Sequence, residues 1–200
     1  MINEKHLFGI EHCYKQGTTD ALIVFFSGTL PTYSAISWFN EDEEYSYLFL
    51  KDDPWYTTYT ARPYHQVIDY YIKNLDRTIF AGISMGGMAA LYHGIDRGIV
   101  GIISIDPFPW QFNPERVMKK LKAIPHDNSI KWPMLFVEYA TNNSYVAQIK
   151  TILFNRPVTI ISMPWASEVH GDFIPSLDMM NALFEFMFKM NQIDKRHNKT

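Results

Sequence analysis

Residues 78–93, TIFAGISMGGMAALYH, decide the fold of this chain. The first four are typical of a short β-strand, and the small and apolar residues from Gly87 to His93 are typical of a helix. Between them, Ser84 has a glycine two positions before it and another two positions after it. Glycine has no Cβ, so neighbouring backbone can pack closely against a tight turn at those positions. The stretch therefore predicts a strand, a sharp turn that projects the Ser84 hydroxyl above a sheet, and a helix.

Segments of strand and helix length alternate on both sides of this turn. Residues 21–26, ALIVFF, form an apolar run typical of a strand that is buried on both faces. The other predicted strands are 47–50, 101–105, 134–137 and 158–163, and the predicted helices are about 64–75, 114–122, 144–154 and 174–190. This alternation predicts the α/β class, a three-layer sandwich with a mostly parallel central sheet and helices on both faces. Residues 6–14 are interpreted as either an edge strand or a hairpin.

The composition narrows the function classes. Two hundred residues suit one domain, and we expect residues 1–200 to form it, with a core at about 21–190 and no separate lid domain. A net charge of −3 gives no reason to expect a nucleic-acid partner. The acidic run 41–44 is interpreted as solvated surface.

Location and cofactors are also expectations from composition. No run reaches transmembrane length, no signal peptide is visible, and Cys13 is the only cysteine. We therefore expect a cytoplasmic protein without stable membrane insertion. No metal or other cofactor is expected, because no His, Asp and Glu grouping has the spacing of metal ligands. The oligomeric state is left open.

Three features resemble the α/β-hydrolase superfamily. They are the Ser27-Gly28-Thr29 turn after the first central strand, the Gly82–Gly86 stretch and His170. The resemblance covers about residues 21–190. A weaker likeness, to bacterial members that acylate or deacylate surface polysaccharides and glycoproteins, is based on the Ser27-Gly28 turn, residues 51–56 and the loop 139–145. The superfamily implies acyl chemistry but specifies no substrate.

The resemblance implies roles for individual residues. Ser84 would be the nucleophile, and a serine hydroxyl needs an adjacent base at neutral pH. His170 would be that base, since it follows the last strand and precedes the C-terminal helix. The backbone N–H groups of Met85 and Thr29 would form the oxyanion hole.

The acid that orients the histidine has two candidates. The superfamily most often places it in the loop after the 134–139 strand, where this chain has Asn142 and Asn143. Asp106 ends the preceding strand, where some lipases keep their acid, and Glu138 ends the 134–139 strand itself. Both remain open, and Asp172 and Asp178 are less favoured. In a serine protease, loss of this acid lowers the rate by about 10⁴-fold.

Three functions are therefore possible. The first is an acyl-ester hydrolase, and the second is an O-acyltransferase in which a sugar hydroxyl replaces water. The third is a catalytically weak binding protein with the hydrolase fold, suggested by the missing acid. Trp55, Tyr56 and Tyr59 are candidates for the wall of a substrate pocket, with packing beneath a loop as the alternative. His65 is interpreted as a surface residue, and Cys13 as structural.

Overall fold

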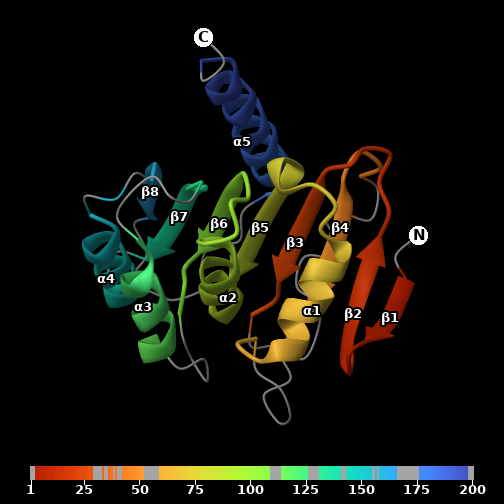
Figure 1. Cartoon of the computed structure of the whole chain (residues 1–200), viewed down its shortest axis with the longest axis horizontal. Coiled ribbons are helices and arrows are strands. Elements are labelled where there is room, and N and C mark those ends of the chain that lie inside the picture. The colour runs from red at the N-terminus through yellow and green to blue at the C-terminus, as the bar shows by residue number, and fades with distance from the viewer. Residues whose placement is uncertain are drawn as a thin grey trace.

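The computed structural model describes residues 3–28, 33, 36–37, 39, 42–51, 59–108, 114–125, 131–140, 143–154, 156, 158–165 and 176–197. Within these residues the chain forms an eight-stranded sheet in the order β1-β2-β4-β3-β5-β6-β7-β8 (Figure 1). The strands are β1 (Asn3–Leu7), β2 (Ile10–Lys15), β3 (Leu22–Phe26), β4 (Ser46–Leu50), β5 (Thr78–Ile83), β6 (Gly101–Ile105), β7 (Met134–Ala140) and β8 (Ile160–Trp165). The helices are α1 (Arg62–Tyr71), α2 (Met85–Gly94), α3 (Pro114–Ala123), α4 (Ser144–Leu153) and α5 (Leu177–His197), with a short 3-10 helix at Leu75–Arg77.

The central strands are parallel and in close register. Phe26 on β3 pairs with Gly82 on β5, which in turn pairs with Ser104 on β6. Every residue of β3 and β6 is buried, as expected for strands covered on both faces. Because the strands run in the same direction, their carboxyl ends meet at one edge of the sheet. This edge brings together the residues that follow β3, β5 and β6.

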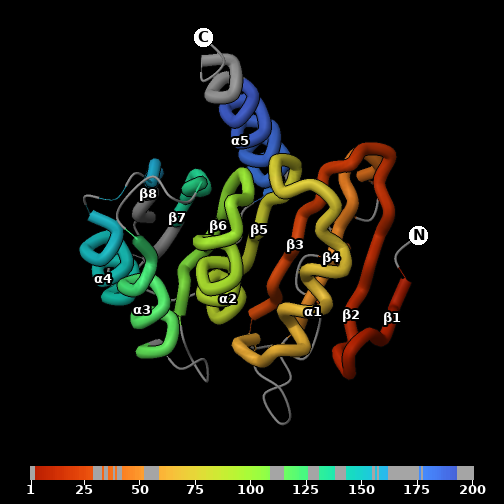
Figure 2. The backbone as a smooth tube through the Cα atoms, in the orientation of Figure 1, coloured from red at the N-terminus to blue at the C-terminus, as the bar shows by residue number. Residues whose placement is uncertain are grey.

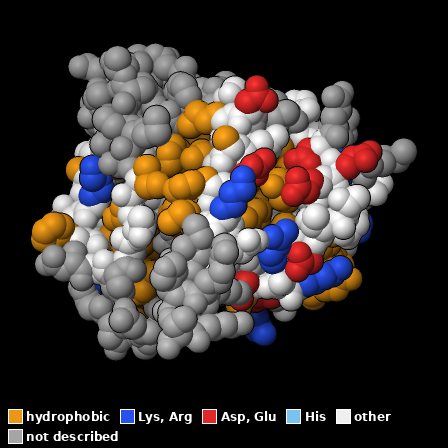
Figure 3. All heavy atoms as spheres, turned by 90° about the horizontal axis from the view of Figure 1, so that it is seen from above, with side chains coloured by type: hydrophobic (Ala, Val, Ile, Leu, Met, Phe, Trp, Pro, Cys, Tyr) orange, Lys and Arg blue, Asp and Glu red, His pale blue; other side chains and the backbone are white. Residues whose placement is uncertain are grey.

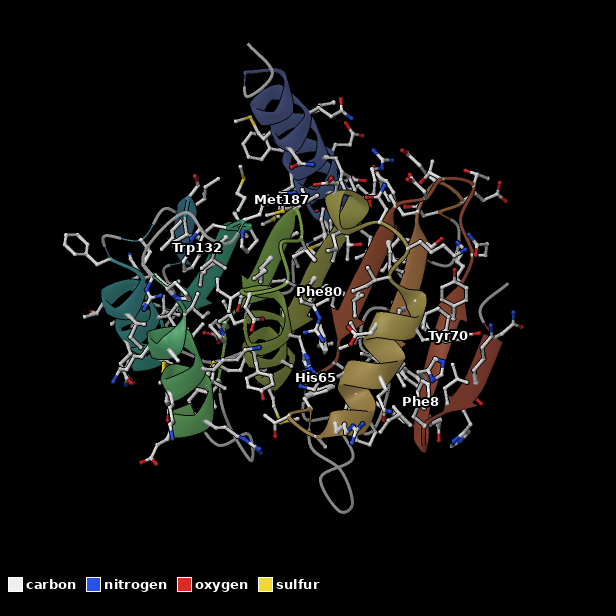
Figure 4. The ribbon with its side chains drawn as sticks, viewed as in Figure 1. Phe8, His65, Tyr70, Phe80, Trp132 and Met187 are labelled. Atoms are coloured by element: carbon white, nitrogen blue, oxygen red, sulfur yellow. The ribbon has the colours of Figure 1, made fainter. Side chains whose placement is uncertain are left out.

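Two hydrophobic cores lie on opposite faces of the sheet. Alternate side chains of β3 point to each face, so Val24 belongs to one core and Phe25 to the other. Helices α1 to α4 contribute to the first core, and Figure 1 shows α1, α2 and α3 in front of the sheet. Helix α5 contributes to the second core through residues such as Phe184 and Met187. Phe80 and Met187, labelled in Figure 4, belong to the first and the second core respectively. The predicted three-layer α/β architecture is confirmed.

The two outermost strands on the β1 side of the sheet are antiparallel to their neighbours. Strands β1 and β2 form a hairpin, and β2 pairs antiparallel with β4. The turn consists of Phe8 at φ 52° and Gly9 at φ 79°, and positive φ at both central residues is the geometry of a two-residue hairpin turn. Of the two interpretations of residues 6–14, the hairpin is therefore correct.

Helix α5 differs most from its predicted bounds. It begins at Leu177 rather than at 174, because the Ser176 hydroxyl accepts a hydrogen bond from the Met179 amide at 3.2 Å and caps the helix. It continues to His197 rather than ending at 190, since no glycine or proline interrupts that run. The backbone trace shows α5 extending beyond the sheet on the side where the parallel strands begin, opposite to their carboxyl ends and far from the N-terminal hairpin (Figure 1 and Figure 2). Among the described residues, no helix has the length and apolar character to cross a membrane.

Charged side chains are unevenly distributed on the face seen from above. Hydrophobic side chains gather in the middle of this face, and most of the acidic and basic side chains in view lie to the right of them (Figure 3). Glu43 and Glu44 are exposed, in agreement with the prediction of a solvated acidic run. Asp42 is less exposed than Glu43 and Glu44, because its carboxylate accepts a hydrogen bond from the Tyr47 hydroxyl.

Candidate functional site

Ser84 has an unusual backbone conformation between β5 and α2. Its φ is 57° and its ψ is −120°, a combination that residues with a Cβ rarely adopt. Such a conformation costs about 1–3 kcal/mol and persists only when its surroundings enforce it. The Ser84 amide donates to the Ile105 carbonyl at 2.8 Å, and the Ser84 carbonyl accepts from the amides of Met88 at 3.3 Å and Phe108 at 3.1 Å. The end of β6 and the first turn of α2 therefore hold Ser84 in place.

Two glycines allow this turn to close. A Cβ on Gly82 would lie closer than 3.0 Å to the Gly86 carbonyl, and a Cβ on Gly86 would overlap the carbonyls of Phe26 and Ser27. In both cases the obstructing atoms are backbone, which cannot rotate away as a side chain can. The G-x-S-x-G spacing thus lets the turn pack on itself and against the end of β3.

The turn after β3 lies against Ser84. A Cβ built on Gly28 would be 3.6 Å from the Ser84 Cβ and 3.5 Å from the Ile83 carbonyl oxygen. The fully buried Tyr59 hydroxyl lies 3.0 Å from the carbonyl oxygens of both Ser27 and Leu50, and so ties the ends of β3 and β4 together. Tyr59 therefore packs beneath this edge rather than lining a pocket.

Two histidines, His93 on α2 and His65 on α1, contact each other through their rings. His93 on α2 is fully buried, stacks on Phe26, and its Nε2 donates to the Tyr59 carbonyl at 2.7 Å. Burial, and secondarily the neighbouring His65, holds the pKa of His93 well below its usual value. Among the described residues, its Nδ1 has no hydrogen-bond partner. His93 is therefore a neutral structural residue at neutral pH.

The prediction of His65 as a surface residue is wrong. His65 on α1, labelled in Figure 4, is half-buried and its ring centroid lies 4.5 Å from that of His93. Its Nδ1 lies 3.1 Å from Nη2 of Arg97. Burial lowers its pKa, as does the Arg97 charge. His65 lies beside the buried face of α1, and its ring contacts those of Tyr92 and His93 on α2. The sequence does not show this contact between the two helices, which explains the difference. Cys13 is buried, and burial raises the pKa of its thiol, in agreement with a structural role.

Asp106 follows β6 and lies in the segment that holds Ser84. It is only 1% exposed and has a positive φ of 40°. The residue before it, Ile105, accepts the hydrogen bond from the Ser84 amide, and Phe108 donates to the Ser84 carbonyl. Ser84 and Asp106 are two of the described non-glycine residues that have a positive φ. Backbone hydrogen bonds join the turns in which they lie.

Asn143 connects Asp106 to α4. Its Nδ2 donates to Asp106 Oδ1 at 2.7 Å and to the Pro107 carbonyl at 3.2 Å. Its Oδ1 accepts from the amides of Tyr145 at 3.1 Å and Val146 at 3.3 Å, which caps the helix. The sequence indicates Asn143 only as a residue at the usual place of the acid and does not predict its contact with Asp106. An asparagine just before a helical run is nevertheless a recognisable N-cap signal.

The other predicted site residues are described only in part or not at all. Met85 is the buried first residue of α2. Glu138 pairs with Ile105 in the register of β7 and β6, one position before Asp106, and its side chain is outside the description. Asp178 lies in the first turn of α5 and is exposed. Outside the described residues lie Thr29, Trp55, Tyr56, Asn142, His170 and Asp172.

Comparison with known proteins gives a likeness in structure only. No protein-family model and no curated protein sequence matches this chain. A capsule O-acetyltransferase of Neisseria meningitidis serogroup A is similar with a TM-score of 0.67 and 20% identity, over 96% of this chain and 94% of its own. An esterase/lipase from an uncultured bacterium has a TM-score of 0.65 and 12% identity, over 96% and 85% of the two chains. The carboxylesterase of Bacillus cereus has a TM-score of 0.62 and 12% identity, over 89% and 94%. At these identities the comparisons establish the fold.

Proposed function

We propose that this chain, which has the α/β-hydrolase fold, is a serine ester hydrolase that works through an acyl-enzyme. The Ser84 oxygen attacks the ester carbonyl carbon while His170 takes the hydroxyl proton and passes it to the leaving alcohol. The N–H groups of Met85 and Thr29 stabilise the oxyanion. His170 then takes a proton from water, whose oxygen attacks the acyl carbon. The bond from that carbon to the Ser84 oxygen breaks, His170 returns its proton to the Ser84 oxygen, and the carboxylic acid leaves. Trp55 and Tyr56 are the proposed substrate contacts.

The observation that supports this proposal is the strained backbone of Ser84. A serine at φ 57° between a strand and a helix is energetically unfavourable, and it is enforced here by hydrogen bonds from two neighbouring segments. Strained backbone of this kind clusters at active sites, where the surrounding structure enforces it. The close approach of the Gly28 turn to Ser84 also supports the proposal, because the proposed oxyanion hole needs an N–H group from a second segment beside the nucleophile.

Asp106 is the preferred acid. Its segment is hydrogen-bonded to the backbone of Ser84, and its carboxylate is buried and held by a donor. Glu138 remains the alternative because β7 places it level with Ile105. A buried carboxylate next to the catalytic histidine would set the histidine tautomer and stabilise its protonated form.

O-acyl transfer to a carbohydrate is the second candidate. It shares the acyl-enzyme and differs only in the acceptor, a sugar hydroxyl in place of water. The capsule O-acetyltransferase of Neisseria meningitidis supports it, because that neighbour matches over 94% of its own length. A catalytically weak binding protein is the third possibility, and it predicts no acyl-enzyme.

A fluorophosphonate probe and p-nitrophenyl acetate test the proposal. We expect the probe to label wild-type protein on the peptide that contains Ser84, and Ser84→Ala to abolish both labelling and hydrolysis, with a loss of about 10⁴-fold or more. His170→Ala should cause a similar loss. Ser104→Ala is the matched control, since Ser104 is a buried serine that donates to the Gly87 carbonyl on α2. It should keep labelling.

The outcomes separate the three functions. Slow hydrolysis that accelerates when a sugar acceptor is added, with acyl-sugar as product, would support the transferase. Absence of labelling in folded wild-type protein would contradict both enzymatic proposals and favour the binding protein.

A further inference from the structure

Both the oxygen and the nitrogen of the Asn143 side-chain amide form hydrogen bonds. The two amides at the start of α4 require an acceptor, so the oxygen of Asn143 must face the helix. The nitrogen must then face the other way, and there it donates to Asp106 Oδ1 and the Pro107 carbonyl. The helix start thus fixes the orientation of the amide that meets the carboxylate.

The carboxylate of Asp106 needs such a donor. A carboxylate that is only 1% exposed is costly to keep charged unless hydrogen bonds stabilise the charged form. The Asn143 amide supplies one at 2.7 Å without bringing a second charge to the site. It also restrains rotation of the carboxyl group, because Oδ1 is held by a side chain anchored on a helix.

We propose that Asn143 is a positioning residue for Asp106, and that the acid function is divided between two loops. The loop after β6 supplies the carboxylate, and the loop after β7 supplies the amide that holds it. This inference rests on the proposed function of Ser84 and His170. It implies that the asparagine at the usual place of the acid is a working part of the site rather than a loss of catalytic power.

Asn143→Asp is the most informative variant, because it keeps the helix cap while it removes the donor. Aspartate is as good an N-cap as asparagine and its charge suits a helix N-terminus. It also places a second carboxylate against Asp106. We expect kcat/KM to fall about tenfold or more at pH 7, and the acidic limb of its pH profile to move to higher pH, because two adjacent carboxylates oppose each other's ionisation.

The opposite assignment predicts the opposite result. If the loop after β7 is the place for the acid, Asn143→Asp completes the triad and kcat/KM rises. An unchanged or increased kcat/KM, with an unmoved acidic limb, would overturn the proposal. Labelling of wild-type Ser84 by the fluorophosphonate probe is measured first, and its absence would contradict the proposed function itself rather than the role of Asn143.

The chain offers a matched control on its surface. Asn74 accepts from the Asp76 amide, which caps the short 3-10 helix, and its Nδ2 donates to Asp20 Oδ2 at 3.0 Å. Asn74→Asp makes the same chemical change next to an exposed carboxylate. It should leave kcat/KM and its pH profile unchanged.

A double variant that exchanges the two residues, Asp106→Asn with Asn143→Asp, distinguishes an effect on catalysis from an effect on the stability of the fold. The double variant restores an amide–carboxylate hydrogen bond with its direction reversed. We expect it to recover most of the stability lost in Asp106→Asn, while kcat/KM remains at least about 10³-fold below wild type. Recovery of activity together with stability would contradict the assignment of the acid to Asp106.

Discussion

The strain at Ser84 can be measured by comparing Ser84→Gly with Ser84→Ala. Both variants remove the hydroxyl, but only glycine removes the Cβ that makes φ 57° and ψ −120° unfavourable. Releasing the strain is worth about 1–3 kcal/mol. Against it, glycine gives the unfolded chain more conformational freedom, which costs about 0.5–1 kcal/mol. We therefore expect the glycine variant to be more stable than the alanine variant by about 1 kcal/mol.

Urea unfolding followed by circular dichroism measures this difference, with equal m-values as the test that the unfolded states are comparable. In a chain of this size the same difference raises Tm by about 2–4 °C. Ser104 gives the control pair, since it lies inside strand β6 and is not among the residues with positive φ. There the glycine variant should be less stable than the alanine variant. A Ser84→Gly variant no more stable than Ser84→Ala would refute the argument that Ser84 is strained.

Two further predictions concern stability. Gly86→Ala should lower the free energy of unfolding by about 3 kcal/mol, because its Cβ would overlap the carbonyls of Phe26 and Ser27. Gly28→Ala should lower it by less than about 1 kcal/mol, since the nearest neighbours of its Cβ would be 3.5 Å and 3.6 Å away. Equal losses in urea unfolding would contradict the packing of the turn against β3. The free energy of unfolding should also fall as the pH drops from 7 to 5. Burial lowers the pKa values of His12, His65 and His93 in the folded state. Below about pH 6.5 these histidines therefore bind protons in the unfolded chain but not in the folded one. The stability that is present above this pH is lost below it, by up to about 1.4 kcal/mol per pH unit for each histidine. His93→Gln should flatten this dependence and His6→Gln, at an exposed site, should not; a stability that does not change between pH 7 and 5 would show that the three histidines are not held neutral.

Local patterns explain why so much of the sheet was predictable. Each central strand is a short apolar run, and such runs specify buried strands through their own composition. The turn at Ser84 is encoded just as locally, by glycines two positions away on either side. Where a prediction depended on a neighbouring helix, it was less accurate, as His65 shows: the sequence pattern of α1 gave no sign that its histidine would contact α2.

The candidate site was predictable only in part. Ser84 and Asp106 each come after a predicted strand, and neighbouring parallel strands bring the residues that follow them close together. The role of Asn143 could not be read in the same way. Its cap signal is local, but the carboxylate it meets is 37 positions away in the chain.

The sequence by itself determined the alternation of strands and helices from residue 21 onward, the turn that carries Ser84, and the end of the sheet at which chemistry is expected. Each of these depends on residues within a few positions of one another. The tertiary structure alone decided that Tyr59 ties β3 to β4 and that Asn143 holds Asp106. Those contacts join segments far apart in the chain. They follow from the distance and angle at which packed loops meet, which no local pattern specifies.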